Sequence, residues 1–168
     1  MSWLTQVDKL ILLAGVGAGT VYGANFLGNS HDKLSDVFIE RTFVSLDRRT
    51  CSPGETFNAG IELAVARNCK PKLCQFELSC VEVAQQIVGT RQVTTEHITY
   101  LDTKTLPLPK TLQKNKQYDL NSSFTIPPGA TQTFHAKNNR IEWRIELTIV
   151  FNRVLKWQEE GVIEVQYS

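Results

Sequence analysis

Apolar and polar residues alternate along most of the chain after residue 37. In residues 141–151 every odd position is apolar, and the even positions are mostly charged or polar. A period of two is typical of a β-strand that buries one face and exposes the other. The same alternation runs through residues 57–65, and more loosely through 118–126. The pattern therefore predicts strands over these three segments.

Shorter β-rich runs fill most of the remaining chain, and turn residues separate them. They cover residues 37–46, 73–84, 92–101, 104–112 and 156–167, which brings the total to about eight strands with no helical period between them. Pro107 and Pro109 remove backbone donors, so 104–112 is expected to be an edge strand or a loop. Repeated strands without crossover helices predict an all-β, antiparallel, immunoglobulin-like sandwich over residues 31–168.

The first thirty residues have a different pattern. Residues 10–28 carry no charge over nineteen positions, and a helix of that length covers about 28 Å, close to the hydrocarbon thickness of a bilayer. We expect residues 1–30 to form a membrane-anchoring transmembrane helix. A signal peptide and a helix buried within a larger assembly are the alternatives, although the poor cleavage pattern argues against the signal peptide.

Glycines in this segment recur every four positions. Gly15, Gly19 and Gly23 fall on one face of the expected helix, and such a ridge lets a second helix approach closely in lipid. We therefore expect this helix to contact a protein neighbour as well as lipid.

Basic residues set the expected orientation. Lys9 alone precedes the apolar segment, whereas Lys33, Arg41, Arg48 and Arg49 follow it within about twenty residues. By the positive-inside rule, we expect a single-pass membrane protein whose β domain faces the cytoplasm. The sequon at residues 121–123 points the other way, but it has meaning only in a eukaryotic lumen.

Four cysteines lie within thirty positions of one another. Cys74 and Cys80 share a predicted strand face with Phe76 and Leu78, so they are expected to be small core residues with free thiols. A disulfide involving Cys51 or Cys69 is the main alternative. A metal site is the weakest alternative, because no CxxC pair occurs and the histidines lack ligand spacing.

The net charge and the absence of known motifs argue against nucleic-acid binding and against catalysis. A formal net charge of +1 offers no field that would attract nucleic acid. His31, His97 and His135 stand outside any recognisable catalytic motif, and no glycine-rich phosphate loop occurs. We therefore expect no enzyme activity, no cofactor, no metal and no small-molecule substrate.

Three segments resemble one family when they are taken in order. They are Pro53-Gly54-Glu55 between the first strands, Phe124-Thr125-Ile126-Pro127 at a strand end, and the tryptophan-bearing strand at 141–145. Together they resemble the arrestin-like fold of arrestins, α-arrestins and the arrestin-like subunit of retromer. The resemblance covers residues 37–167 and implies a sandwich that binds other proteins. Independently of it, Trp143 is expected to fill the space between two sheets.

The chain departs from that family in three ways. Arrestins have two sandwiches, whereas this chain has room for one. The PPxY motif, through which α-arrestins recruit ubiquitin ligases, is absent. An N-terminal membrane span is not a usual feature of the family. A role in ligase recruitment is therefore unsupported.

The expected function is that of a membrane-anchored, non-enzymatic adaptor or scaffold. The first candidate partner surface is the loop from 127 to 139, with Phe134, His135, Lys137 and Arg140 as candidate contacts. A second candidate is the basic turn at 67–72. The alternatives are an accessory structural subunit of a larger membrane complex and an exported, adhesion-type sandwich.

Overall fold

The computed structural model describes residues 22–23, 38–151 and 156–167. This part of the chain consists of β-strands, turns and loops. The strands are β1 (Tyr22–Gly23), β2 (Ile39–Leu46), β3 (Thr50–Cys51), β4 (Thr56–Val65), β5 (Leu73–Val88), β6 (Arg91–Thr105), β7 (Gln117–Thr125), β8 (Phe134–His135), β9 (Asn139–Val150) and β10 (Lys156–Val165).

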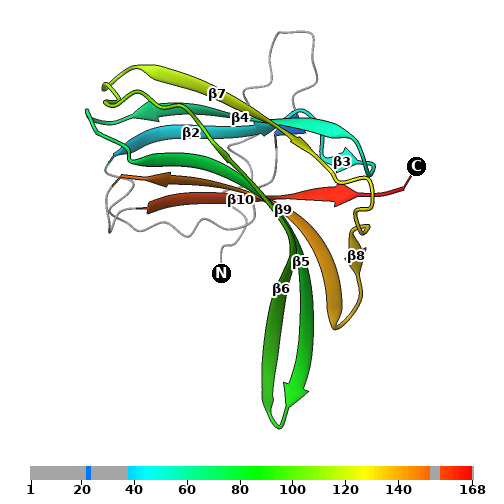
Figure 1. The fold of residues 1–168 in the computed structure, drawn as a ribbon. Coiled ribbons are helices and arrows are strands. Elements are labelled where there is room, and N and C mark those ends of the chain that lie inside the picture. Colours follow the sequence, from blue (N-terminus) through cyan, green and yellow to red (C-terminus); the bar gives the residue numbers. More distant parts are fainter. Residues whose placement is uncertain (1–21, 24–37, 152–155, 168) are drawn as a thin grey trace.

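The strands form two sheets (Figure 1). The first has the order β1-β2-β4-β7, and the second has the order β3-β10-β9-β5-β6, with β8 beside β9. All pairs are antiparallel except β3 with β10. The all-β, mostly antiparallel architecture predicted from alternation is confirmed for the described residues.

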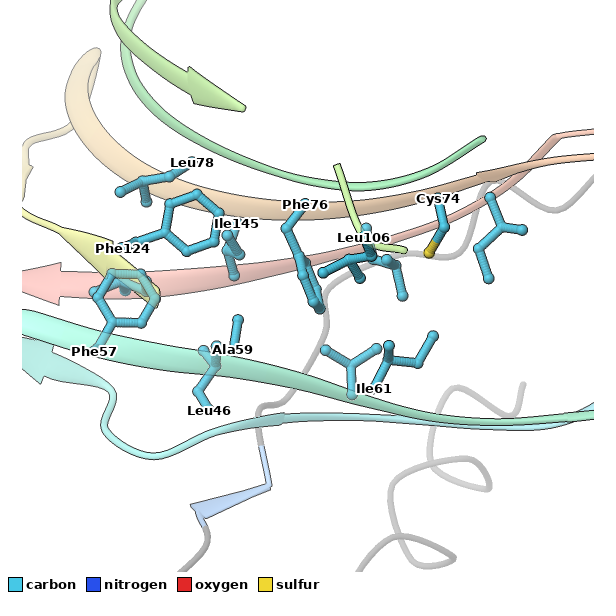
Figure 2. Close-up of a cluster of buried hydrophobic side chains, with 14 of the residues drawn as sticks. Leu46, Phe57, Ala59, Ile61, Cys74, Phe76, Leu78, Leu106, Phe124 and Ile145 are labelled. Carbon is cyan, nitrogen blue, oxygen red and sulfur yellow. The ribbon is translucent and has the colours of Figure 1, made fainter. Parts of the chain in front are cut away.

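The core lies between the two sheets. Figure 2 shows Leu46, Phe57 and Ile61 of the first sheet directed toward Phe76 and Ile145 of the second. All five side chains are buried. Each comes from a strand in which alternate residues are buried, which is the pattern that two facing sheets produce.

The predicted core residues are in place. Trp143 is buried and tilts against Tyr100, with the ring centroids 5.4 Å apart. Its indole Nε1 donates a hydrogen bond to the carbonyl oxygen of Thr131 at 2.9 Å, so the ring is buried without an unpaired donor. All four cysteines are free and buried. Burial raises the pKa of Cys51 to about 11 and that of Cys74 to about 12.

Turn chemistry explains how β3 leads into β4. The Glu55 amide donates to the Ser52 carbonyl oxygen at 3.0 Å, and Gly54 has a φ of +88°. Proline followed by a glycine at positive φ is the arrangement of a type II turn. The Gly54 amide also donates to Ile126 at 2.8 Å, which ties this turn to the end of β7.

The run at 104–112, predicted to be an edge strand or a loop, is mostly a loop, because β6 ends at Thr105. Leu106 and Leu112 anchor this loop in the core. The expected loop at 127–139 contains the short strand β8.

Most of the predicted membrane helix lies outside the described residues, including Gly15 and Gly19. At Tyr22 and Gly23 the structure has a strand where the sequence predicted a helix. These two residues pair with Leu46 and Ser45, at the outer edge of β2. An open sheet edge offers unpaired backbone groups, which explains why it can accept a short strand. In the described residues, no helix has the length and hydropathy to cross a membrane.

Candidate functional site

One end of the second sheet extends away from the two packed layers (Figure 1). We call this part the arm: β5 after Cys80, β6 up to Ile98, all of β8 and residues 139–142 of β9. Val88 and Arg91 are paired across the tip, so only two residues connect β5 to β6. Gly89, the first of them, has a φ of +65°, as in a type II′ hairpin turn. Local turn chemistry therefore builds the tip.

The predicted partner residues gather at the β8 edge of the arm. Phe134 pairs with Ile141, and His135 pairs with Arg140. Lys137 is exposed in the connection between β8 and β9, which the 2.8 Å hydrogen bond from the Ala136 amide to the Asn139 carbonyl oxygen closes. The Phe134 side chain is 51% exposed. The structure thus brings the four residues together on one hairpin.

The chain before β8 is fastened to the sandwich. The hydroxyl of Tyr167 donates to Ala130 at 3.0 Å, and the Thr133 amide donates to Val165 at 2.8 Å. Thr133 Oγ1 in turn accepts a hydrogen bond from the Val165 amide at 2.8 Å. The β8–β9 hairpin therefore begins from a segment that is held in place against the sandwich.

A charged network lies where the arm joins the sandwich, on the face of the second sheet that points away from the core. Arg144 donates to Glu96 at 3.1 and 3.3 Å and to Glu142 at 2.7 and 3.0 Å. Arg140 forms a second ion pair with Glu142, and Glu160 lies 3.5 Å from Arg144. Because β5 lies between β9 and β6, the Arg144–Glu96 pair crosses over β5 and links its two neighbours.

Partial burial and hydrogen bonding act in opposite directions on this network. Burial alone would raise the pKa of Glu142, but its hydrogen bonds and ion pairs with Arg144 and Arg140 lower the pKa below its usual value. Burial alone would lower the pKa of Arg144, but its hydrogen bonds to Glu96 and Glu142 and the nearby charge of Glu160 raise it. Arg144 and Glu142 therefore stay charged as a pair. The hydrogen bonds from Arg144 to Glu96 hold β6 against β9.

Several exposed apolar side chains lie along β5 and β6, most of them on the arm. Ile87 is 80% exposed, Ile98 55% and Leu101 52%, while Val88 and Val93 are also exposed. Sequence reasoning missed their exposure, because residues 85–101 were interpreted as ordinary strand and turn. The available signal was that apolar residues there lose the strict alternation seen in 141–149.

The second sequence-based candidate, the turn at 67–72, has internal contacts. The guanidinium of Arg67 lies 4.2 Å from the ring centroid of Phe38. Asn68 accepts a hydrogen bond from the Lys114 amide at 2.8 Å, and Cys69 bridges to Leu112. These contacts link the turn to the 106–116 loop, so it serves packing in this structure.

No group of three or more His, Cys, Asp or Glu side chains in the described part of the chain is arranged to hold a metal ion. His97 and His135 lie exposed on different strands of the arm, and His31 falls outside the described residues. What the arm offers chemically is a recognition surface: free strand edges, exposed apolar residues and a few basic side chains.

No family model matches the chain, and no curated protein matches it. Solved structures do match, and 113 of their chains are similar to this one. One is the crystal structure of Spo0M, a sporulation control protein from Bacillus subtilis, with a TM-score of 0.58 and 12% sequence identity. The match covers 76% of this chain and 49% of the Spo0M chain, so this chain spans about half the length of that protein.

At 12% identity this likeness concerns the fold alone. It supports an arrestin-like sandwich, the fold that the three sequence motifs resemble. Because one fold carries many functions, the function must be argued from the arm.

Proposed function

We propose that this chain is a non-enzymatic adaptor that binds another protein through the β8 edge of its arm. The observation that supports this most directly is the placement of Phe134, half-exposed, beside His135, Lys137 and Arg140 on a hairpin that extends beyond the packed layers. An exposed aromatic ring with neighbouring cations suits a partner segment that carries an apolar anchor and carboxylates. The Spo0M likeness fits a regulatory domain of this kind.

We propose further that residues 10–28 attach the domain to a membrane with the sandwich on the cytoplasmic side. The support is the uncharged length of this segment and the four basic residues that follow it. A helix through residue 28 would require Tyr22 and Gly23 to leave their pairing with β2. A topology experiment therefore also tests that pairing.

Affinity capture from gently solubilised membranes tests the adaptor role. We expect the full chain to retain a partner, and we expect Phe134→Ser together with Lys137→Glu to lose most of it. Lys110→Glu, a charge reversal at an exposed position in the 106–116 loop, is the matched control and should retain the partner. Equal capture by both variants would remove the β8 edge from the proposal.

The glycine ridge favours a second candidate function, that of an accessory subunit packed through its helix. Two further variants separate the two candidates: a chain that lacks residues 1–30, and the full chain with Gly19→Leu. If both variants lose the partner while the Phe134 and Lys137 double variant keeps it, the result indicates an accessory subunit. Protection of the sandwich from the cytoplasmic side of intact membranes would instead indicate the exported alternative.

A further inference from the structure

The outermost strand of the arm, β6, is an open sheet edge. It runs for fifteen residues and pairs only with β5 among the described residues. Such an edge presents a row of unpaired backbone donors and acceptors, and it is a template for another strand. This edge lies on the side of the arm opposite β8.

The hairpin geometry identifies which backbone groups point outward. Val88 and Arg91 flank the two-residue turn, so their backbone groups hydrogen-bond to each other. Hydrogen-bonded and non-hydrogen-bonded pairs alternate from there. The N–H and C=O groups of Gln92, Thr94, Glu96 and Ile98 therefore face away from β5.

This stretch lacks most of the devices that usually protect an edge. Proteins blunt edges with proline, charged side chains (lysine above all), bulges or core-facing charges. Residues 91–98 contain no proline and no lysine, and the irregularity of β6 comes only at Thr99. Their two charged residues are Arg91 at the turn and Glu96, whose side chain is hydrogen-bonded to Arg144 across β5.

The other long edges do carry such devices. The outer edge strand β7 exposes Asp119 and Asn121, two poor strand formers, and Pro127 follows it. Strand β10, which pairs with β3 only at its end, carries Glu159 on its core-facing side. Among these strands, β6 is the one whose edge is left open.

The edge is also held ready for pairing. The Arg144–Glu96 ion pair fixes the middle of the 91–98 stretch to β9. Val93, Thr94, Thr95 and Ile98 are β-branched and favour an extended chain. Less conformational entropy is then lost when a second strand binds.

We propose that β6 pairs antiparallel with β6 of a second copy of this chain, about a two-fold axis at Thr95. This register sets Gln92 opposite Ile98, and Thr94 opposite Glu96, so all four outward-facing residues form hydrogen-bonded pairs in both copies. A register centred on Glu96 would oppose two glutamates, and one centred on Thr94 would leave Ile98 opposite the turn.

Charge and apolar exposure favour a second copy as the occupant. In the register centred on Thr95, no like charges lie opposite each other along the paired stretch. The net charge of +1 leaves little repulsion between whole molecules. Pairing also partly covers Val93 and Ile98 of both copies, which are exposed in the single chain.

A cysteine at the axis tests the register in the full-length chain. In an antiparallel, non-hydrogen-bonded pair the Cα atoms are about 4.5 Å apart, which a disulfide can span. We expect Thr95→Cys to give a covalent dimer under mild oxidation. The native cysteines are buried and their pKa values are raised, so they should not compete.

Thr90→Cys is the matched control, because Thr90 is exposed at the tip of the same hairpin. In the proposed register its mate lies about 30 Å away along the strands, so it should give little covalent dimer. Equal cross-linking of the two variants, or none by Thr95→Cys, would overturn the proposal.

A proline tests the backbone pairing itself. Thr94→Pro removes an outward donor without breaking a bond to β5. We expect it to weaken dimerisation by about tenfold or more, since a hydrogen bond is lost in each copy. Thr94→Val is the control and should remain dimeric by light scattering in detergent.

An unchanged dimer in Thr94→Pro, with an unchanged melting temperature, would contradict edge pairing. A monomeric unmodified chain would contradict the dimer as a whole. Partner capture through Phe134 should survive in Thr94→Pro, so failure of this inference and failure of the proposed adaptor role give different results.

Discussion

Glu159 combines a strand position with an unusual ionisation. It pairs with Leu147, a core residue, and therefore lies on the core-facing side of β10. Burial raises its pKa from 4.5 to about 7. A charge directed toward the core at an open edge discourages further strand addition, because burying it deeper costs free energy.

Replacement of Glu159 should change how stability depends on pH. In the unfolded chain the Glu159 carboxyl loses its proton near its ordinary pKa of 4.5, whereas in the folded protein it keeps the proton up to about pH 7. The free energy of unfolding therefore falls as the pH rises from about 4.5 to about 7. We expect Glu159→Gln to stabilise the protein by about 2 kcal/mol at about pH 8 and by little at about pH 4. Urea unfolding at the two pH values measures this.

Glu164→Gln is the control, because Glu164 is exposed on the same strand. It should change the unfolding free energy by less than about 0.5 kcal/mol at either pH. Equal effects of the two variants would contradict a specific cost of burying the Glu159 carboxylate.

Among the elements, the arm depends on a contact that crosses a strand. Arg144 of β9 reaches Glu96 of β6 over β5, and its side chain is 17% exposed. Its removal would leave the carboxylates of Glu96, Glu142 and Glu160 near one another without their shared cation. The arm should then lose both attraction and hydrogen bonds.

We expect Arg144→Met to lower the unfolding free energy by about 1.5–3 kcal/mol, the range for hydrogen bonds to charged groups. Amide exchange should also accelerate in residues 91–98. Lys104→Met removes a more exposed ion pair, with Asp102, and should cost less than about 1 kcal/mol. If both variants lost the same unfolding free energy, the Arg144–Glu96 contact would not be what holds the arm together.

For the molecule as a whole, we expect the sandwich and the arm to have separable roles. Most side chains from Ala84 to Thr99 are exposed, whereas the core residues lie between the two sheets (Figure 2). The outer part of the arm, residues 84–99, therefore contributes little to the core. We propose that the length of the arm serves recognition and not stability.

Shortening the arm tests this separation. We expect replacement of residues 85–94 by Asn-Gly to keep the fold, because Ala84 and Thr95 are paired and a two-residue turn can join them. The unfolding free energy should change by about 1 kcal/mol or less, while dimerisation is lost. Leu106→Ala, in the core, should cost about 2–5 kcal/mol in the same urea assay. If shortening the arm lowered the unfolding free energy by a similar amount, the arm would be part of the core and the separation would be wrong.

The period-two alternation by itself determined the strands, the buried faces of Cys74, Phe76 and Leu78, and the central place of Trp143. These features follow from neighbours along the chain, since alternation decides which side chains share a face. The Pro-Gly pair likewise determined the turn at Gly54, because a positive φ at glycine is a local property of the chain. The three arrestin-like motifs likewise correspond to a sandwich of that kind.

The tertiary structure alone decided which strands lie at an edge and which residues a second layer covers. Ile98 and Leu101 look like core residues in the sequence, yet no facing sheet buries them. Glu96 and Arg144, forty-eight positions apart, meet only because β5 separates their strands by one position in the sheet. Such pairings depend on long-range register, which no local pattern encodes.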